Sequence, residues 1–313
     1  MTTVELPLLD LMPGGEAWSR QITASKIPGI FNASKYSSPT KEFYLLRGEV
    51  ERDGENDATQ RGRDFEPVIL DRFFRRHPEL ERIEAGSFSR PGLEGWASAT
   101  PDAMAREQYG PTYVVEAKTD GRGDYQWGPA GSSEIPLGYY LQVQWQMHMT
   151  GARQAWVVCL GPYYDETDYL IAYDRGLAAD IEAFAREFHA NAMNPHGVPP
   201  KVDGHEETYN AIRRAHPEID RGEHEDWPIS LDLAHEFDDA VNGLDAAEEA
   251  MNLARSKMLR VMGNARRAVI PGGATAKGKP KVQVVATRQP SKRGVALYKM
   301  RKPLDWTLAE GAQ

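Results

Sequence analysis

The sequence has one cysteine, Cys159, among 313 residues. A single thiol cannot form an internal disulfide, which excludes a disulfide-stapled fold and fits a reducing compartment. Cys159 lies in the apolar run AWVVCL, where we expect a small core residue and not a nucleophile. The chain also lacks an apolar run of about 18 residues, so no membrane span is predicted. Its N-terminus, MTTVELPLLDLMPGGE, lacks the basic stretch and apolar core of a secretion signal, and we expect a cytoplasmic protein.

Negative charge is absent from residues 251–303, which contain 14 Lys or Arg and no Asp or Glu. The rest of the chain holds the other 23 of the 37 basic residues and all 46 acidic ones, within a formal net charge of −9. A basic segment on an acidic body suggests a polyanion as partner. A solvated basic surface that balances the acidic body is the alternative.

Internal repeats and a spaced His/Cys set of the kind that binds zinc are also lacking. Helical and strand-like segments interleave up to about residue 203 without regular βαβ spacing. This pattern predicts an α/β fold with a central mixed β-sheet flanked by helices. From about residue 228 onward the character changes: a long amphipathic stretch, SLDLAHEFDDAVNGLDAAEEAMNLARSKMLRVMG, is followed by KVQVVATRQ and GVALYKM, which suggest a basic β-hairpin. We therefore expect one domain over 1–203 and a helical and β-hairpin extension over 204–313.

The stretch RGRDFEPVILDRFFRR has helical periodicity, with Phe65, Ile69 and Phe73 four residues apart. Pro67 fits only the first turn of a helix, so the helix is expected to begin near Asp64, with Glu66 at its opening. An acid there could simply favour the helix dipole.

The segment WASATPDAMAREQYGPTYVVEAKTD places charged residues where an apolar strand is expected. In YVVEAK, alternation puts Val114, Glu116 and Lys118 on one face and the intervening residues on the other. Two charged groups in an apolar strand are costly unless partners or a metal compensate them. Asp102, after a proline, supplies another carboxylate close by in sequence. Such oxygen ligands suit Mg²⁺, although Glu-x-Lys pairs are common on surface strands.

Five motifs in order give these residues a context: ITAS, RGRDFEPVILDRF, SATPDAM, VVEAKT and YYLQVQWQMHMTGA. Together, over residues 16–203, they resemble the phage lambda exonuclease and YqaJ viral recombinase family, within the PD-(D/E)XK nuclease superfamily. The resemblance implies a restriction-endonuclease-like core for residues 1–203.

The resemblance also implies roles for single residues. Metal ligands are expected from Asp102, Glu116 and the backbone carbonyl of Ala117, with Glu66 completing the environment of a second ion. Lys118 is expected to position the attacking water. Gln142 is expected to orient the lysine or the water, with Gln144 the less favoured choice. Without the resemblance, an exposed polar position on a helix would be the better interpretation of Gln142.

Contacts with DNA phosphates near a 5′ end are implied for Arg20, Thr23, Ser25 and Thr100. Thr23 or Ser25 could instead cap a short helix in AWSRQITASKIPGIF, and Arg20 could be an ordinary surface residue. In the Gly- and Pro-rich loop of residues 120–138, Tyr125 and Trp127 could stack on a splayed base or pack on their own domain.

The expected activity is that of a Mg²⁺-dependent exonuclease, with two ions and Mn²⁺ as a possible substitute, that degrades linear double-stranded DNA 5′ to 3′ and leaves 3′ overhangs for phage-type recombination. By the same resemblance we expect a homo-oligomer, such as a trimeric ring, and a single-strand annealing protein as partner, in the host cytoplasm if a phage encodes the chain. Two alternatives stay open: a RecB-like single-strand nuclease or endonuclease on this fold, and a non-catalytic DNA-binding module. The C-terminal extension could contact DNA, a partner or another subunit, and its charge favours DNA.

Overall fold

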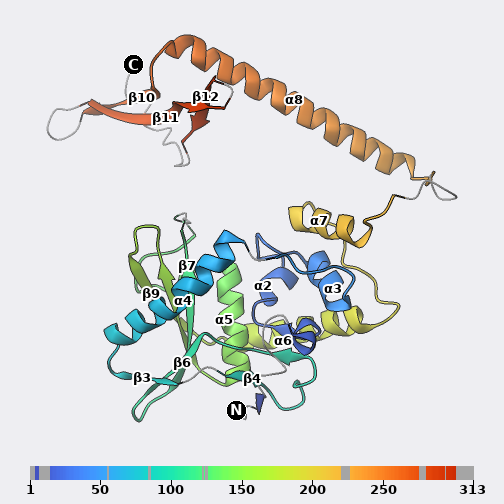
Figure 1. Cartoon of the computed structure of the whole chain (residues 1–313), viewed down its shortest axis with the longest axis vertical. Helices are drawn as coiled ribbons and strands as arrows, with labels where there is room; N and C mark the ends of the chain where they lie inside the picture. Colours follow the sequence, from blue (N-terminus) through green and yellow to red (C-terminus); the bar gives the residue numbers. More distant parts are fainter. Residues whose placement is uncertain are drawn as a thin grey trace. The chain divides into compact units, whose positions relative to one another are not determined.

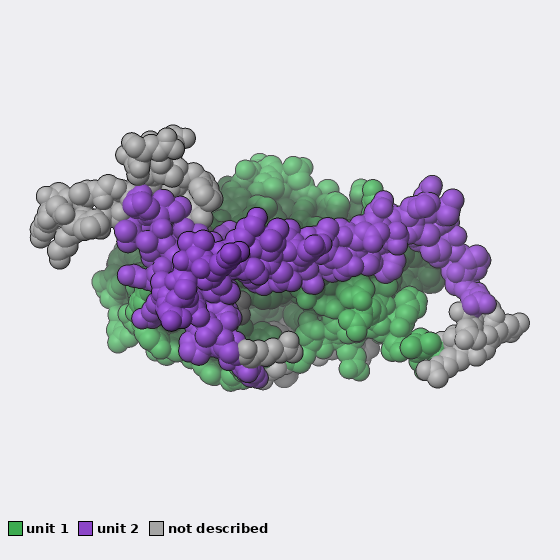
Figure 2. Space-filling view, turned by 90° about the horizontal axis from the view of Figure 1, so that it is seen from above, with its two compact units in different colours: residues 1–219 green, residues 220–313 purple. Residues whose placement is uncertain are grey.

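The computed structural model describes most of the chain in two compact units, residues 1–219 and 220–313, coloured separately in Figure 2. The described residues are 4–6, 15–54, 56–83, 86–121, 123, 126–219, 226–274, 280–292 and 294–300. Within these residues, no helix combines the length and the hydrophobicity needed to cross a membrane.

Unit 1 is built on a five-stranded sheet in the order β3-β6-β7-β8-β9. The strands are β3 (Leu80–Ile83), β6 (Ala103–Glu107), β7 (Thr112–Thr119), β8 (Gln154–Leu160) and β9 (Glu166–Ala172). Only β7 and β8 pair in parallel, and the other neighbours are antiparallel. The predicted mixed sheet flanked by helices is confirmed.

Two long helices cover opposite faces of this sheet (Figure 1). The helix α4 (Asp57–Arg76) packs Ile69 and Phe73 against the face that carries Val115. The helix α5 (Leu137–Thr150) packs Val143 and Met147 against the face that carries Val114. Successive residues of β7 therefore lie in different apolar clusters, as the alternation in YVVEAK predicts.

A further group of elements packs on the other side of α5. It contains α1 (Glu16–Ser19), β2 (Ile22–Thr23), α2 (Ile27–Ile30), α3 (Pro39–Arg47), β5 (Ala97–Ser98) and α6 (Arg175–Met193). Buried Ile22, Phe43 and Ile181 join β2, α3 and α6 to Trp145 of α5 in one apolar cluster. At one edge, β1 (Val4–Leu6) pairs antiparallel with β4 (Ser87–Ser89).

The start of α4 differs from the prediction. The helix begins at Asp57, where Asn56 and Thr59 form a capping box: Thr59 N donates to Asn56 Oδ1 at 3.1 Å, and Asn56 N donates to Thr59 Oγ1 at 2.9 Å. Pro67 therefore lies inside the helix and not in its first turn, so Glu66 is not at the opening. The interpretation of Glu66 as an acid that favours the helix dipole is thus wrong.

The short helix α2 also differs, because Lys26 occupies its N-cap and no side chain caps it. Thr23 and Ser25 are not helix caps. Instead Thr23 belongs to β2, which pairs in parallel with β5.

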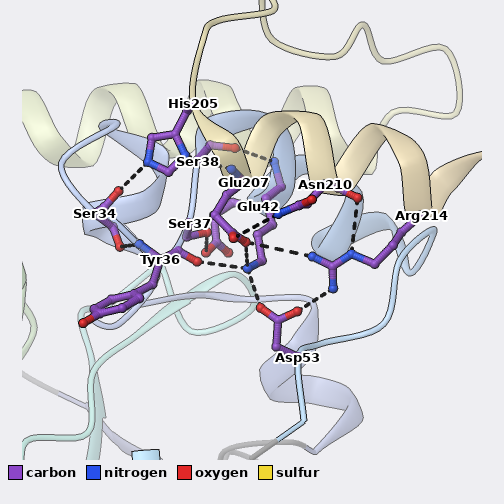
Figure 3. A network of polar contacts seen from close by, with 11 residues as sticks. Ser34, Tyr36, Ser37, Ser38, Glu42, Asp53, His205, Glu207, Asn210 and Arg214 are labelled. Carbon is purple, nitrogen blue, oxygen red and sulfur yellow. Dashed lines mark hydrogen bonds and ion pairs between the residues drawn. The ribbon is translucent and has the colours of Figure 1, made fainter. Parts of the chain in front are cut away.

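Helix α7 (Glu206–Ala215) belongs to unit 1, so the compact unit ends after Ile219 and includes residues beyond 203. Figure 3 shows the polar network that joins α7 to α3. The buried Lys41 of α3 donates to Glu207 of α7 and, at 2.6 Å, to Asp53, which also binds Arg214 of α7 at 2.5 Å. This network explains why the chain stays attached to the domain beyond residue 203.

Unit 2 consists of one long helix and a small sheet. The helix α8 (Leu231–Met262) begins at the cap Ser230, whose hydroxyl accepts from Leu233 N. The predicted hairpin is present as β11 (Pro280–Ser291) and β12 (Gly294–Lys299), which pair antiparallel. A strand that was not predicted, β10 (Arg267–Ala274), pairs with β11 and makes the sheet three-stranded.

Candidate active site

A buried carboxylate on β7 is at the centre of the candidate site. Glu116 is only 2% exposed, on the face covered by α5. Its Oε1 accepts hydrogen bonds of 2.5 Å from Lys118 Nζ and of 2.5 Å from Gln142 Nε2, and its Oε2 accepts one of 2.7 Å from Gln146 Nε2. Three donors thus offset the cost of burying this charge.

Asp102 reaches the same strand from the start of β6. Strand β6 begins at Ala103, which pairs with Val115, so β7 continues past the end of its neighbour. The N–H of Ala117, beyond that end, donates to Oδ2 of Asp102 at 2.8 Å. In a strand the N–H and C=O of one residue face the same neighbour, so the carbonyl of Ala117 also faces the side on which β6 has ended.

Glu66 brings a third carboxylate from the middle of α4. Burial and the nearby charge of Glu116 raise the pKa of Glu66. Burial and the Glu116 charge also raise the pKa of Asp102 well above its usual range. Burial alone would lower the pKa of Lys118, but the carboxylates of Glu116 and Asp102 outweigh this effect and raise it. Three carboxylates thus interact with one ammonium, which leaves an excess of negative charge.

This donor set fits a hard divalent cation. No three Asp, Glu, His or Cys side chains among the described residues converge closely enough to form a ready-made metal cage. Mg²⁺ needs no such cage, because it keeps several waters and binds through one or two carboxylates together with substrate phosphate oxygens. Asp102, Glu116 and the carbonyl of Ala117 supply the oxygens, and the crowding of carboxylates that raises the pKa of Asp102 is what a cation would relieve.

The two glutamine candidates of α5 have different surroundings. Gln142 donates to Glu116, whereas Gln144 donates to the Ala172 carbonyl at 2.8 Å and accepts from Asp174 N at 2.9 Å. Gln142 therefore contacts the site, and Gln144 joins α5 to the end of β9 and the start of α6.

Gln146 is a site residue that was not predicted from the sequence. It follows Gln142 by four residues on a helix, and this spacing places two side chains on one face. The spacing is the signal in LQVQWQ that could have found it. Gln146 is 1% exposed, and its Oε1 has no hydrogen-bond partner among the described residues.

Tyr139 is a second residue that was not predicted. The ammonium of Lys118 lies over the Tyr139 ring, 5.1 Å from its centre. Trp127 stacks on Tyr139 with ring centres 5.6 Å apart, and it also contacts Tyr169 at 5.2 Å. Trp127 thus packs on its own domain, and Tyr125 lies outside the described residues.

The four candidate DNA contacts come from two segments that β2 and β5 align. Thr23 pairs in parallel with Ser98, so Ser25 and Thr100 each follow the paired residues by two positions. Thr23 Oγ1 lies 3.1 Å from Ser25 Oγ, and Thr100 Oγ1 lies 2.7 Å from Ser87 Oγ. Arg20 is exposed, and its carbonyl accepts a 2.8 Å hydrogen bond from His189.

A buried lysine fixes the segment that carries these residues. Lys26 is 2% exposed, and its ammonium donates to the carbonyls of Trp18 at 2.7 Å, Ser19 at 2.9 Å and Gln21 at 2.5 Å. These bonds tie α2 to the chain on both sides of Arg20. Nothing in the motif ITASKIPG indicates this role, because a lysine there is typical of an ordinary surface position.

Three carboxylates and a lysine lie near one end of β7, the central strand of the mixed sheet, and they are the residues that the resemblance to the lambda exonuclease and YqaJ family singles out. Residues 16–153 match the family model described as the YqaJ-like viral recombinase domain, which confirms the resemblance for this part of the chain. No curated protein sequence matches the chain significantly.

The solved structures that match this chain include an alkaline exonuclease and a phage-related exonuclease. The alkaline exonuclease LHK-Exo from Laribacter hongkongensis is 21% identical, with a TM-score of 0.44, over 56% of this chain and 88% of that one. A phage-related exonuclease from Haemophilus somnus 129PT is 12% identical, with a TM-score of 0.38, over 54% of this chain and 93% of that one.

Proposed function

We propose that this protein is a Mg²⁺-dependent exonuclease that degrades linear double-stranded DNA from its 5′ ends and leaves 3′ single strands for phage-type recombination. The observation that carries the proposal is the gathering of Asp102, Glu116 and Lys118 where β7 extends past the start of β6: Asp102 accepts from the N–H of Ala117, and Lys118 donates to Glu116. The matched family supports a role in recombination, and the 5′-to-3′ polarity rests on the resemblance.

Each site residue has a task that follows from its position. Asp102, Glu116 and the Ala117 carbonyl would hold one Mg²⁺, and Glu66 would serve a second. When bound, such ions polarise the scissile phosphate and favour the hydroxide form of a bound water. Mn²⁺ has the same preference for oxygen ligands and should substitute.

Lys118 can hold the attacking water or offset charge that develops on the phosphate oxygens. Its raised pKa keeps it in the ammonium form, which suits charge stabilisation and the donation of hydrogen bonds, not proton abstraction. Tyr139 supports that ammonium from one side, and Gln142 and Gln146 fix the orientation of the Glu116 carboxylate.

DNA phosphates near the 5′ end would contact the hydroxyls of Thr23, Ser25 and Thr100 and the guanidinium of Arg20. The register Thr23↔Ser98 supports a shared surface, because it aligns the ITAS segment with the strand that leads to Asp102. We also propose DNA contact by the basic residues of unit 2, a homo-oligomer such as a trimeric ring, and a single-strand annealing protein as partner.

The test uses purified protein on four substrates of equal sequence: linear duplex, closed circular duplex, linear single strand and circular single strand. We expect degradation of the linear duplex alone, dependent on Mg²⁺, abolished by EDTA and by Asp102→Ala. Cutting of the circular duplex would replace the proposal with an endonuclease, and preference for single strands with a RecB-like enzyme. Binding of duplex ends without any cleavage by the wild type would identify a non-catalytic module.

A further inference from the structure

The helix α8 carries an unbroken apolar seam with the period of a coiled coil. Nine positions separated by alternating steps of four and three residues are all apolar: Leu233, Phe237, Ala240, Leu244, Ala247, Met251, Ala254, Met258 and Val261. A mean spacing of 3.5 residues over about four heptads is the pattern with which helices pair by knobs-into-holes packing. An amphipathic helix that covers a globular core usually shows a wider apolar face with period 3.6.

This seam is exposed over most of its length. No residue of α8 is buried, and three of the four large a-type side chains are exposed, Phe237 by 72%, Leu244 by 61% and Met251 by 52%, whereas Met258 is half-buried. The helix is about 48 Å long. Most of the stability of protein helices comes from packing of an apolar face, so an uncovered seam of this length predicts a helical partner.

The sizes of the seam residues indicate how the partner is oriented. In heptad notation the a positions are Phe237, Leu244, Met251 and Met258, all large, whereas the inner d positions are Ala240, Ala247 and Ala254, all small. In a parallel pair, a residues would pack against a residues and d residues against d residues. Layers with two large side chains would then alternate with layers that hold two alanines and leave space unfilled. An antiparallel pair places a beside d, so every inner layer holds one large and one small side chain, as dense packing requires.

The charges of α8 favour the same orientation. Residues 231–249 contain seven Asp or Glu and no Lys or Arg, whereas residues 250–262 contain three Lys or Arg and no Asp or Glu. This order also suits the dipole of the helix itself, but the dipole acts only in the first and last turns. Two parallel copies would align their acidic halves, whereas two antiparallel copies align each acidic half with a basic end.

We propose that α8 pairs with α8 of a second copy of this chain as an antiparallel two-helix coiled coil. The seam and the charges of α8 are complementary to those of a second α8 that runs in the opposite direction. A two-fold interface requires such a self-complementary surface, so the partner is a second copy of this chain. The pairing goes beyond the nuclease activity and is independent of it. If the nuclease domains form rings, α8 joins rings in pairs.

The first test compares molar masses by light scattering after size exclusion, with the full chain of 35.0 kDa. Leu244→Glu with Met251→Glu places two charges in the seam, and Asn242→Glu with Ser256→Glu places the same charges on the opposite face as a control. We expect an even-numbered wild-type assembly, half that mass for the seam variant and the wild-type mass for the control. A monomer, an odd-numbered assembly or an unchanged mass of the seam variant would overturn the proposal.

The second test measures orientation with a spin label at Asp239→Cys in a Cys159→Ala background. An antiparallel pair centred near residue 249 separates the two labels by roughly 30 Å along the axis, whereas a parallel pair keeps them within roughly 20 Å. The shorter distance would overturn the antiparallel arrangement. Nuclease activity of the seam variant on linear duplex is measured alongside, so that loss of pairing and failure of the proposed activity are told apart.

Discussion

The backbone N–H of Ala117 donates a 2.8 Å hydrogen bond to Oδ2 of Asp102, and this bond joins the two motifs of the candidate site. It forms because β6 begins at Ala103 and leaves the end of β7 without a strand partner on that side. A carboxylate takes the place that a backbone carbonyl would occupy in a continued ladder. The position of Asp102 relative to Glu116 is thus fixed by the sheet.

Without a metal ion, repulsion among the carboxylates of Asp102, Glu116 and Glu66 should lower the free energy of unfolding. We expect Asp102→Asn, which keeps an acceptor for Ala117 but removes the charge, to raise the free energy of unfolding by about 1 kcal/mol in EDTA, because repulsion from Glu116 and Glu66 disappears. Mg²⁺ should stabilise the wild type and not the variant. Thermal unfolding in EDTA and in Mg²⁺ measures both effects, and equal stabilisation of the two proteins by Mg²⁺ would contradict the assignment of Asp102 as a ligand.

Gln146 should act by holding Glu116. Gln146→Leu removes the donor to Glu116 Oε2, and we expect activity on linear duplex to fall by about 10- to 100-fold, with a higher Mg²⁺ concentration needed for half-maximal rate. Gln144→Leu is the matched control on the same helix, because its partners are backbone groups of Ala172 and Asp174. The control should lower thermal stability without changing the Mg²⁺ requirement. A Mg²⁺ titration that shifts equally for both variants would show that Gln146 has only a structural role.

Lys26 should stabilise the segment around Arg20. Lys26→Met leaves the carbonyls of Trp18, Ser19 and Gln21 without their donor, and we expect a decrease of about 3 kcal/mol in unfolding free energy. Urea unfolding measures this decrease, with Lys35→Met, at an exposed position nearby in the sequence, as the control. A decrease no larger than that of the control would contradict the role of Lys26.

The same lysine should give stability a dependence on pH. Burial and the nearby Arg52 charge lower the pKa of Lys26 to about 7, whereas in the unfolded chain it stays near 10.5. Between these values the unfolded state binds one more proton, so stability rises with pH, by at most about 1.4 kcal/mol per pH unit relative to Lys26→Met. The three carbonyl acceptors favour the ammonium form and make that slope an upper limit. A wild-type advantage that shrinks from pH 7 to pH 9 would contradict the lowered pKa.

The basic sheet of unit 2 should contribute to DNA affinity through interactions with phosphates. Reversing Lys292 and Lys299 to Glu should weaken duplex binding and reduce the slope of log affinity against log salt by about 0.9 for each phosphate interaction that the change removes. Reversing Lys201 and Arg213, exposed residues of unit 1, changes the net charge equally and serves as the control. An equal effect of both pairs would show that net charge alone matters.

The sequence predicted the parts of this fold that depend on local periodicity. The alternation in YVVEAK placed Glu116 and Lys118 on one face of β7, and the pattern of KVQVVATRQ and GVALYKM predicted the pairing of β11 with β12. The mixed sheet flanked by helices followed from the order of such segments. These features could be predicted because one buried face dictates the register of its own element.

The features that were missed depend on contacts between distant segments or on competing local signals. Pro67 suggested a helix start near Asp64, but the capping box of Asn56 and Thr59 stabilises an earlier start, and α4 tolerates a proline in its interior. Lys26 and Tyr139 acquire their roles only from the carbonyls and the ammonium that the fold places beside them. Strand β6 is short, and its turn-rich flanks concealed it.

Hydrolysis from the 5′ ends of duplex DNA at Asp102, Glu116 and Lys118 can be followed by the release of end labels. A linear duplex labelled at either the 5′ or the 3′ terminus is incubated with Mg²⁺ and the wild type, with Asp102→Ala as the inactive control. We predict early release of the 5′ label, retention of the 3′ label on a lengthening single strand, and no release by the variant. Early release of the 3′ label, or release by Asp102→Ala at the wild-type rate, would contradict the proposed activity.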